Sequence, residues 1–194
     1  MMRRALLGGI AALVGGTAWQ NGVFDPVVNP EDAAADVTDT AAVNAAFLDR
    51  YNAMRADRGL PEATQSDTLT DMASAHAEHM ADHEYLAHEQ PDGTTIEDRY
   101  LDRGLLPGCR LPAAGDRYYN GAENVAGAAV GRVRHPGSDE TYTIYNADDL
   151  ARFLFDSWMR SDSHRRVMTL PAVRRIGLGV GRTGDDLYAA VEFC

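Results

Sequence analysis

The sequence contains no lysine. All 18 basic residues of the 194-residue chain are arginine, against 29 acidic residues, which gives a formal net charge of −11. Binding to a phosphate backbone needs a basic surface, so this charge balance argues against a nucleic-acid partner. It argues against other acidic partners for the same reason.

The acidic residues are mostly aspartate, with 20 Asp against nine Glu. A lysine-free, Asp-rich surface is what a high-salt environment favours, because strongly hydrated carboxylates keep a protein soluble where charges are screened. The composition therefore indicates a halophilic source, and we expect an archaeon. A genome of high GC content would also replace Lys by Arg, but it would not explain the excess of Asp.

Cysteine is scarce as well. The chain has two, Cys109 and Cys194, and neither belongs to a C-x-x-C pattern, so a cysteine metal cluster is not expected. In an exported protein such a pair can form one disulfide, which would close a long loop and contribute about 4 kcal/mol. Two unpaired thiols are the alternative.

A long apolar run is also missing. The uncharged stretch at 5–16 is shorter than the roughly 20 residues of a membrane-spanning helix. It follows two arginines, so residues 1–20 are predicted to be a signal peptide or an N-terminal anchor, exported by the general or the twin-arginine route. Residues 21–39 are acidic and contain two prolines, as expected of a linker, which leaves 40–194 as the globular domain. We expect a protein that is secreted or tethered to the outer face of the membrane.

Within the domain, apolar periodicity predicts helices and a hairpin near the end of the chain. The expected helices are 40–58, 67–85, 95–103 and 146–159; the expected strands are 141–145, 175–181 and 187–193. A short extended piece followed by a Gly/Ala loop is expected in 118–129, and a polar exposed segment in 131–140.

Histidines lie on the apolar stripe of the helix expected at 67–85. At about 100° per residue, the stripe contains Leu69, Ala73, His76, Met80 and His83. His76 and His83 are therefore predicted to point toward the buried side. They are either core histidines bonded to the backbone or part of a cavity shared with His88.

A zinc-protease motif is nearly present but fails on spacing. The run from His83 to His88 has one residue more than H-E-x-x-H, so the two imidazoles would lie about 140° apart on a helix. His79 and His83 do have i, i+4 spacing, but no Glu follows the first of them. The protease motif is therefore rejected.

Three remote polar residues stand beside small or apolar neighbours: His88, Glu123 and His164. The first follows Leu-Ala, and the second lies in Gly-Ala-Glu-Asn-Val-Ala. The third lies in Trp-Met-Arg-Ser-Asp-Ser-His-Arg, where Ser161 or Asp162 can cap a new helix and place His164 in its first turn.

These segments, together with Asn-Ala-Met-Arg at 52–55 and Gly-Leu-Pro at 59–61, occur in the order and spacing of a known family. Over about residues 41–193 the chain resembles the CAP family of cysteine-rich secretory proteins, antigen 5 allergens and pathogenesis-related-1 proteins. It is most similar to the prokaryotic, SCP-like extracellular branch. The resemblance implies an α+β fold, a three-layer α-β-α sandwich with a central antiparallel sheet.

The resemblance also implies a site. In the family two histidines and two acidic residues usually face one cleft, and His88, Glu123 and His164 match three of these four. The usual position of the second acid is Ser161 here, so it is missing or supplied by Asp162. Such a set can hold zinc or another divalent cation, or act as a general acid/base pair on water. We add His83 as a further cleft residue.

We expect a binding or envelope-interaction module rather than an enzyme, because no nucleophile is evident. Ser163 directly precedes His164 and cannot readily align with its imidazole. The expected ligand is a small molecule, a lipid or a peptide, and cell-envelope components are further candidate partners. The alternatives are a secreted metal-dependent, peptidase-like hydrolase that uses the same cleft, and a purely structural secreted domain.

Overall fold

The computed structural model describes residues 37–112, 117–134 and 139–194. The predicted signal peptide or anchor at 1–20 lies outside these residues, as does most of the predicted linker at 21–39. Val37, near the end of that linker, is fully buried in the core. None of the helices in the described part of the chain combines the length and the apolar character that crossing a membrane requires.

A four-stranded sheet forms the middle layer. Its order is β1 (Thr64–Gln65), β7 (Arg175–Thr183), β8 (Asp186–Phe193) and β4 (Ala122–Ala129). β1 runs parallel to β7, and the other neighbours are antiparallel. The predicted hairpin is confirmed as β7–β8, and the sheet is central and mainly antiparallel, as the resemblance implied.

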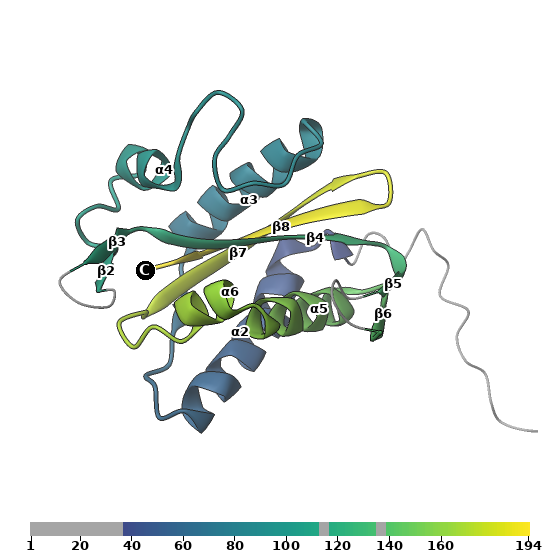
Figure 1. Cartoon of the computed structure of the whole chain (residues 1–194), viewed down its shortest axis with the longest axis horizontal. Helices are drawn as coiled ribbons and strands as arrows, with labels where there is room; N and C mark the ends of the chain where they lie inside the picture. Colours follow the sequence, from purple (N-terminus) through teal and green to yellow (C-terminus); the bar gives the residue numbers. More distant parts are fainter. Residues whose placement is uncertain (1–36, 113–116, 135–138) are drawn as a thin grey trace, which may run out of the picture.

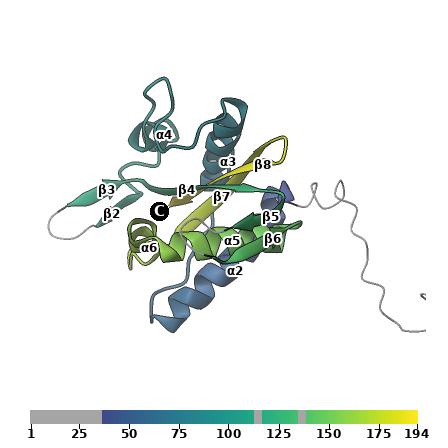
Figure 2. The same ribbon diagram turned by 45° about the vertical axis from the view of Figure 1, so that its right-hand side comes forward.

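Helices cover both faces of this sheet (Figures 1 and 2). One face carries α3 (Asp67–Asp82) and, beyond it, α4 (Ile96–Asp102); the other carries α2 (Thr40–Asp57), α5 (Ala147–Arg160) and α6 (Asp162–Met168). Two short ribbons extend from opposite ends: β2 (Arg110–Pro112) with β3 (Tyr118–Asn120), and β5 (Gly131–Arg134) with β6 (Thr141–Ile144). The predicted three-layer α+β sandwich is thereby confirmed.

One local prediction is wrong. Residues 122–129 form one continuous strand rather than a Gly/Ala loop, because all eight residues pair in register with β8. Gly131–Arg134, in the segment predicted to be polar and exposed, pairs with β6 as a strand, and Arg132 and Arg134 are exposed.

Three glycines of β7 let α3 lie directly on the sheet. They are Gly177, Gly179 and Gly181, and an added Cβ would lie 2.1, 2.1 and 2.2 Å from Thr70 N, Ser74 N and Ala77 O, respectively. A strand residue with any side chain would collide with the helix backbone at these points. The alternation of glycine therefore sets the distance between helix and sheet.

Polar side chains join α2 to the remainder of the fold. Asn44 accepts a hydrogen bond of 2.9 Å from Leu178 N and donates one to Leu178 O. Arg55 is fully buried and donates to main-chain oxygens of four residues outside α2, among them Pro61 at 2.6 Å and Val173 at 3.0 Å. These bonds satisfy a buried cation through carbonyl dipoles.

Cys109 and Cys194 form a disulfide, which confirms the predicted pairing. The bridge joins the loop before β2 to the residue after β8, across a sequence separation of 85. Both cysteines are buried beside Leu69, Met72 and Tyr100.

Candidate functional site

His88 and Glu123 are brought together as predicted. His88, in the loop after α3, places Nδ1 2.8 Å from Oε1 of Glu123 on β4. The Glu123 side chain is fully buried, whereas that of His88 is 45% exposed. The pair therefore consists of a solvent-facing imidazole oriented by a carboxylate inside the protein.

Arg99 of α4 completes this arrangement, and sequence reasoning did not identify it. Its guanidinium donates two hydrogen bonds: one from Nη2 to Glu123 Oε2 at 2.5 Å, and one from Nη1 to the carbonyl of His88 at 3.0 Å. Both carboxyl oxygens of Glu123 thus have a partner. Glu123 acts here as a buried anchor that holds His88, and its oxygens do not face open solvent.

A second carboxyl group lies opposite the first. Glu192 on β8 is the register partner of Glu123 and is fully buried. Burial, and then the negative charge of Glu123, raise the pKa of Glu192 well above its usual value. Burial alone would raise the pKa of Glu123 too, but the hydrogen bond from His88 and the charge of Arg99 outweigh it and lower that pKa. The two pKa values are therefore shifted in opposite directions, which favours one ionised carboxyl group beside one protonated carboxyl group.

His76 also lies next to Glu123, deep under the site. Its Nε2 is 3.0 Å from the Ala87 carbonyl and 3.7 Å from Glu123 Oε2. Since a carbonyl only accepts, Nε2 carries the hydrogen. Burial is the largest cause that lowers the pKa of His76, so the ring is neutral. Of the two interpretations offered for His76, the core histidine bonded to the backbone is the one that fits. Its ring also helps to bury Glu123.

The prediction that His83 faces the buried side is wrong. α3 ends at Asp82, and His83 is its exposed C-cap residue. Its ring stacks on that of His79, with ring centroids 4.1 Å apart. His83 is not among the residues that line the hollows beside His88 or His164.

His164 lies in the first turn of α6, as predicted, and its carbonyl accepts a hydrogen bond of 3.3 Å from Asn124 Nδ2. Burial, and then the nearby His88, lower the pKa of His164. Ser161 ends α5 and precedes α6, but its side chain makes no capping bond. Asp162, the other candidate for the second acid, is exposed and pairs with Arg165.

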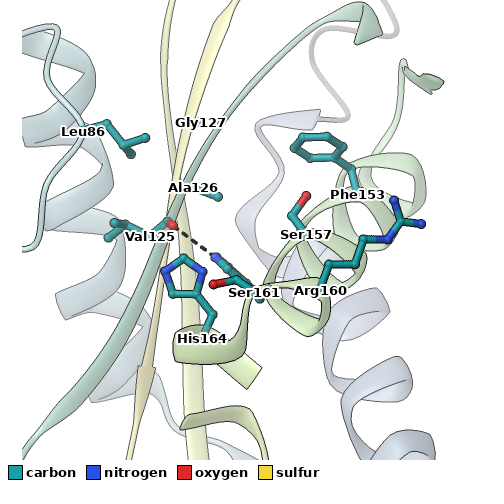
Figure 3. A pocket seen from close by; sticks show the side chains of 10 residues that line it. Leu86, Val125, Ala126, Gly127, Phe153, Ser157, Arg160, Ser161 and His164 are labelled. Atoms are coloured by element: carbon teal, nitrogen blue, oxygen red, sulfur yellow. Dashed lines mark hydrogen bonds between the residues drawn. The ribbon is translucent and has the colours of Figure 1, made fainter. Parts of the chain in front are cut away.

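A pocket of about 400 Å³ opens beside His164, between β4 and α5 (Figure 3). Its lining is mostly apolar and consists of Leu86, Val125, Ala126, Gly127, Phe153, Ser157, Trp158, Arg160, Ser161 and His164. The indole Nε1 of Trp158 donates to the Val125 carbonyl at 3.1 Å and fixes α5 against β4 at the pocket wall. We call this space the β4–α5 pocket.

A second, more polar hollow of about 480 Å³ adjoins His88. Its lining includes Glu89, Glu97, Tyr118 and Tyr119. The two histidines of the predicted site thus face different hollows, while His88 remains close enough to lower the pKa of His164.

A three-ligand metal site does not fit this geometry. Both carboxyl oxygens of Glu123 already accept hydrogen bonds, from His88 and Arg99, and the side chain is fully buried. Over residues 37–112, 117–134 and 139–194, no group of three or more His, Cys, Asp and Glu side chains is arranged to hold an ion. The expected zinc or divalent cation on His88, Glu123 and His164 therefore has no structural support.

The chain was compared with families and solved structures. The model of the CAP family, the cysteine-rich secretory protein family, matches residues 48–194. The chain belongs to the CAP family. This confirms the family predicted from the sequence, whereas the halophilic archaeal origin stays a prediction. None of the curated proteins compared matches the chain.

Solved CAP structures share the fold. An extracellular protein of Bacillus anthracis that contains an SCP domain matches with a TM-score of 0.52 and 19% identity, over 84% of this chain and 43% of that one. This CAP chain thus spans less than half of that protein. An outer surface protein of Borrelia burgdorferi matches with a TM-score of 0.56 and 17% identity, over 80% of this chain and 93% of that one. At such identities the likeness concerns the fold alone.

One residue of the site, Glu192, could have been found from the sequence. Glu192 is a single acidic residue within the apolar run Ala-Ala-Val-Glu-Phe of β8, and a charge in such a run suggests a buried partner. Arg99 had no comparable signal, because it stands among the charged residues of α4.

Proposed function

We propose that this CAP protein is an extracellular binding module, and that its ligand has an apolar part that enters the β4–α5 pocket. The observation that carries the proposal is the pocket itself, a space of about 400 Å³ with mostly apolar walls. Cavities of this size and character are typical of small-molecule sites. A small molecule, a lipid chain or an apolar side chain of a peptide would each bury its surface there.

The polar groups of the pocket suggest what else the ligand carries. The Ser157 hydroxyl is buried and has no hydrogen-bond partner among the described residues. It points into the pocket from α5 (Figure 3). An unpaired buried hydroxyl costs free energy, so a ligand atom that bonds it would gain affinity. His164, whose pKa is lowered, supplies a neutral imidazole in the same lining.

The proposal can be tested with a fluorescent apolar probe, 8-anilinonaphthalene-1-sulfonate, in concentrated salt. Leu86 lines the pocket and is 51% exposed, and Leu101 is 55% exposed outside it, so they form a matched pair. Leu86→Ala should weaken binding about tenfold, because the contact area of a Leu side chain contributes about 1.5 kcal/mol. Leu101→Ala should bind as the wild type does.

Filling the space gives the complementary result. Ala126→Phe should abolish probe binding while far-UV circular dichroism stays unchanged, since Ala126 lines the pocket and is only partly buried. Equal affinities for the Leu86→Ala and Leu101→Ala variants would reject the pocket as the binding site.

A secreted hydrolase is the second candidate, and the His88–Glu123 pair favours it. A buried carboxylate that orients an exposed imidazole is the arrangement of a general base. Turnover of generic ester and peptide substrates should then disappear in His88→Ala and fall in Glu123→Gln. Binding of the probe without any turnover would leave the binding module as the function.

A further inference from the structure

His79 and His83 form a second imidazole pair, on a different part of the surface from the β4–α5 pocket. They stand four residues apart at the C-terminal end of α3, and their rings stack with centroids 4.1 Å apart and an interplanar angle of 18°. Two histidines at i, i+4 share one side of a helix, which is the spacing by which helices present two ligands to one ion.

The hydrogen bonds of both rings leave the same nitrogen available. His83 Nδ1 lies 3.0 Å from the His79 carbonyl, which can only accept, so Nδ1 carries the hydrogen and Nε2 keeps its lone pair. His79 Nδ1 lies 2.9 Å from the Tyr85 hydroxyl, which can accept. Within the described part of the chain, no hydrogen bond involves Nε2 of either ring. Metal-binding histidines almost always donate their other ring nitrogen in this way.

The distances suit a common ion. Two nitrogens that are each about 2 Å from one metal are at most about 4 Å apart. The ring centroids are 4.1 Å apart, but the stacked rings lie nearly parallel, so their Nε2 lone pairs do not converge in this arrangement. The exposed His83 ring has to turn out of the stack, and give up its bond to the His79 carbonyl, before both Nε2 atoms contact one ion.

The electrostatic surroundings favour a cation. The pKa of Asp92 is lowered first by hydrogen bonds from Thr94 and, to a smaller extent, by His79, so the Asp92 carboxylate lies within electrostatic range of this ring. The whole chain carries a formal net charge of −11, which raises the local concentration of cations.

We propose that His79 and His83 form a surface site for a divalent transition-metal ion, with water completing the coordination. Imidazole nitrogen suits Cu²⁺, Ni²⁺ and Zn²⁺, and for one set of ligands Cu²⁺ binds most tightly. The site is independent of the β4–α5 pocket and of the His88–Glu123 pair, and Tyr85 is its positioning residue.

The test is calorimetry of the full chain with Cu²⁺ in a buffer without amines or carboxylates. His79→Asn and His83→Asn should each remove this site or weaken it at least tenfold, because one of two ligands is lost. Tyr85→Phe should weaken it about tenfold, the lower end of the effect of losing an outer partner. The control is His164→Asn, which should leave the site unchanged, and electron paramagnetic resonance should show two nitrogen ligands in the wild type.

Two results would overturn the proposal. One is Cu²⁺ affinity in His83→Asn equal to that of the wild type; the other is a loss that follows His164→Asn and not the α3 variants. If His83→Asn fails to fold by circular dichroism, His79→Asn and Tyr85→Phe still decide the question. Since His164 lines the β4–α5 pocket and the α3 pair does not, failure here is separate from failure of the proposed ligand site.

Discussion

Glu123 and Glu192 face each other across β4 and β8, and Arg99 lies close to both. Arg99 Nη2 is 2.5 Å from Glu123 Oε2 and 3.9 Å from Glu192 Oε1. One cation beside two buried carboxyl groups leaves room for one negative charge, and the hydrogen bond from His88 assigns it to Glu123. The proton on Glu192 is therefore part of what holds the exposed imidazole in place.

This proton makes stability depend on pH. The pKa of Glu192 is raised in the folded state, so the folded protein binds a proton that the unfolded chain loses above about pH 4.5. Stability is full below that pH and declines as the pH rises toward the folded-state pKa. Glu123 has the opposite sign, because its lowered pKa makes its contribution disappear in acid.

Glu192→Gln should therefore stabilise the protein at pH 7 by about 1 kcal/mol or more, since one pKa unit corresponds to about 1.4 kcal/mol. At pH 4 the variant and the wild type should be nearly equal. Urea unfolding at both pH values measures the difference, with exposed Glu62→Gln as the control. At each pH the quantity of interest is the unfolding free energy of the variant minus that of the wild type. If this difference is smaller at pH 7 than at pH 4, Glu192 is not protonated in the folded protein.

The sequence predicted that His88 and Glu123 lie together, but not which way the Glu123 side chain points. The prediction treated Glu123 as a ligand that faces the cleft with His164, whereas the carboxylate points inward to Arg99 and His88. A residue pattern can bring two segments together, but the orientation of a side chain depends on partners such as Arg99 that lie elsewhere in the chain.

At the scale of elements, α3 and β7 make a backbone contact so close that only glycine fits on the strand. An added Cβ at Gly179 would lie 2.1 Å from Ser74 N, and a helix backbone cannot move aside locally. At Gly127 on β4, by contrast, the nearest atom would be Leu86 Cδ2 at 3.5 Å, which is an ordinary contact.

Gly179→Ala should destabilise the fold by about 3 kcal/mol, because overpacking forces the helix away from the sheet. Gly127→Ala should change stability by less than about 0.5 kcal/mol. The free energies of unfolding in urea give both values. Similar losses in the two variants would mean that β7 and α3 adjust more easily than their backbone contact suggests.

The elements that the sequence predicted well are those with a clear period. The helix predicted at 40–58 is confirmed as α2, whose buried residues include Val43, Phe47, Tyr51 and Met54, and the predicted hairpin is confirmed as β7–β8. β4 was predicted only as a short extended piece followed by a loop, because its Ala and Gly residues have low strand propensity, and its eight pairs with β8 override that propensity. The apolar stripe predicted for α3 is buried as far as Met80, whereas His83, beyond the last residue of the helix, is exposed.

For the whole molecule, the disulfide fixes the end of the central strand to a distant loop. A crosslink over 85 residues removes conformational entropy from the unfolded chain, which corresponds to about 4.5 kcal/mol. Cys109→Ser with Cys194→Ser should lower the free energy of unfolding by an amount near this value.

The measurement is urea unfolding of the oxidised protein, the reduced protein and the double variant. The last two should agree, which separates the crosslink from the change of side chain. Unchanged stability on reduction would show that the backbone bonds between Cys194 and Arg175, both 2.8 Å, hold the strand end without the bridge.

The place of β8 in the sheet has a consequence for biosynthesis. Residues 186–193 lie between β7 and β4 and pair with both, so a nascent chain that stops short of them has no middle strand on which to assemble. While these residues are still inside the ribosome, β4 has no neighbour in the sheet, and Glu123 lacks the strand that carries Glu192. The sheet can therefore be completed only after residues 186–193 have been made, which makes their synthesis the step that allows the domain to fold.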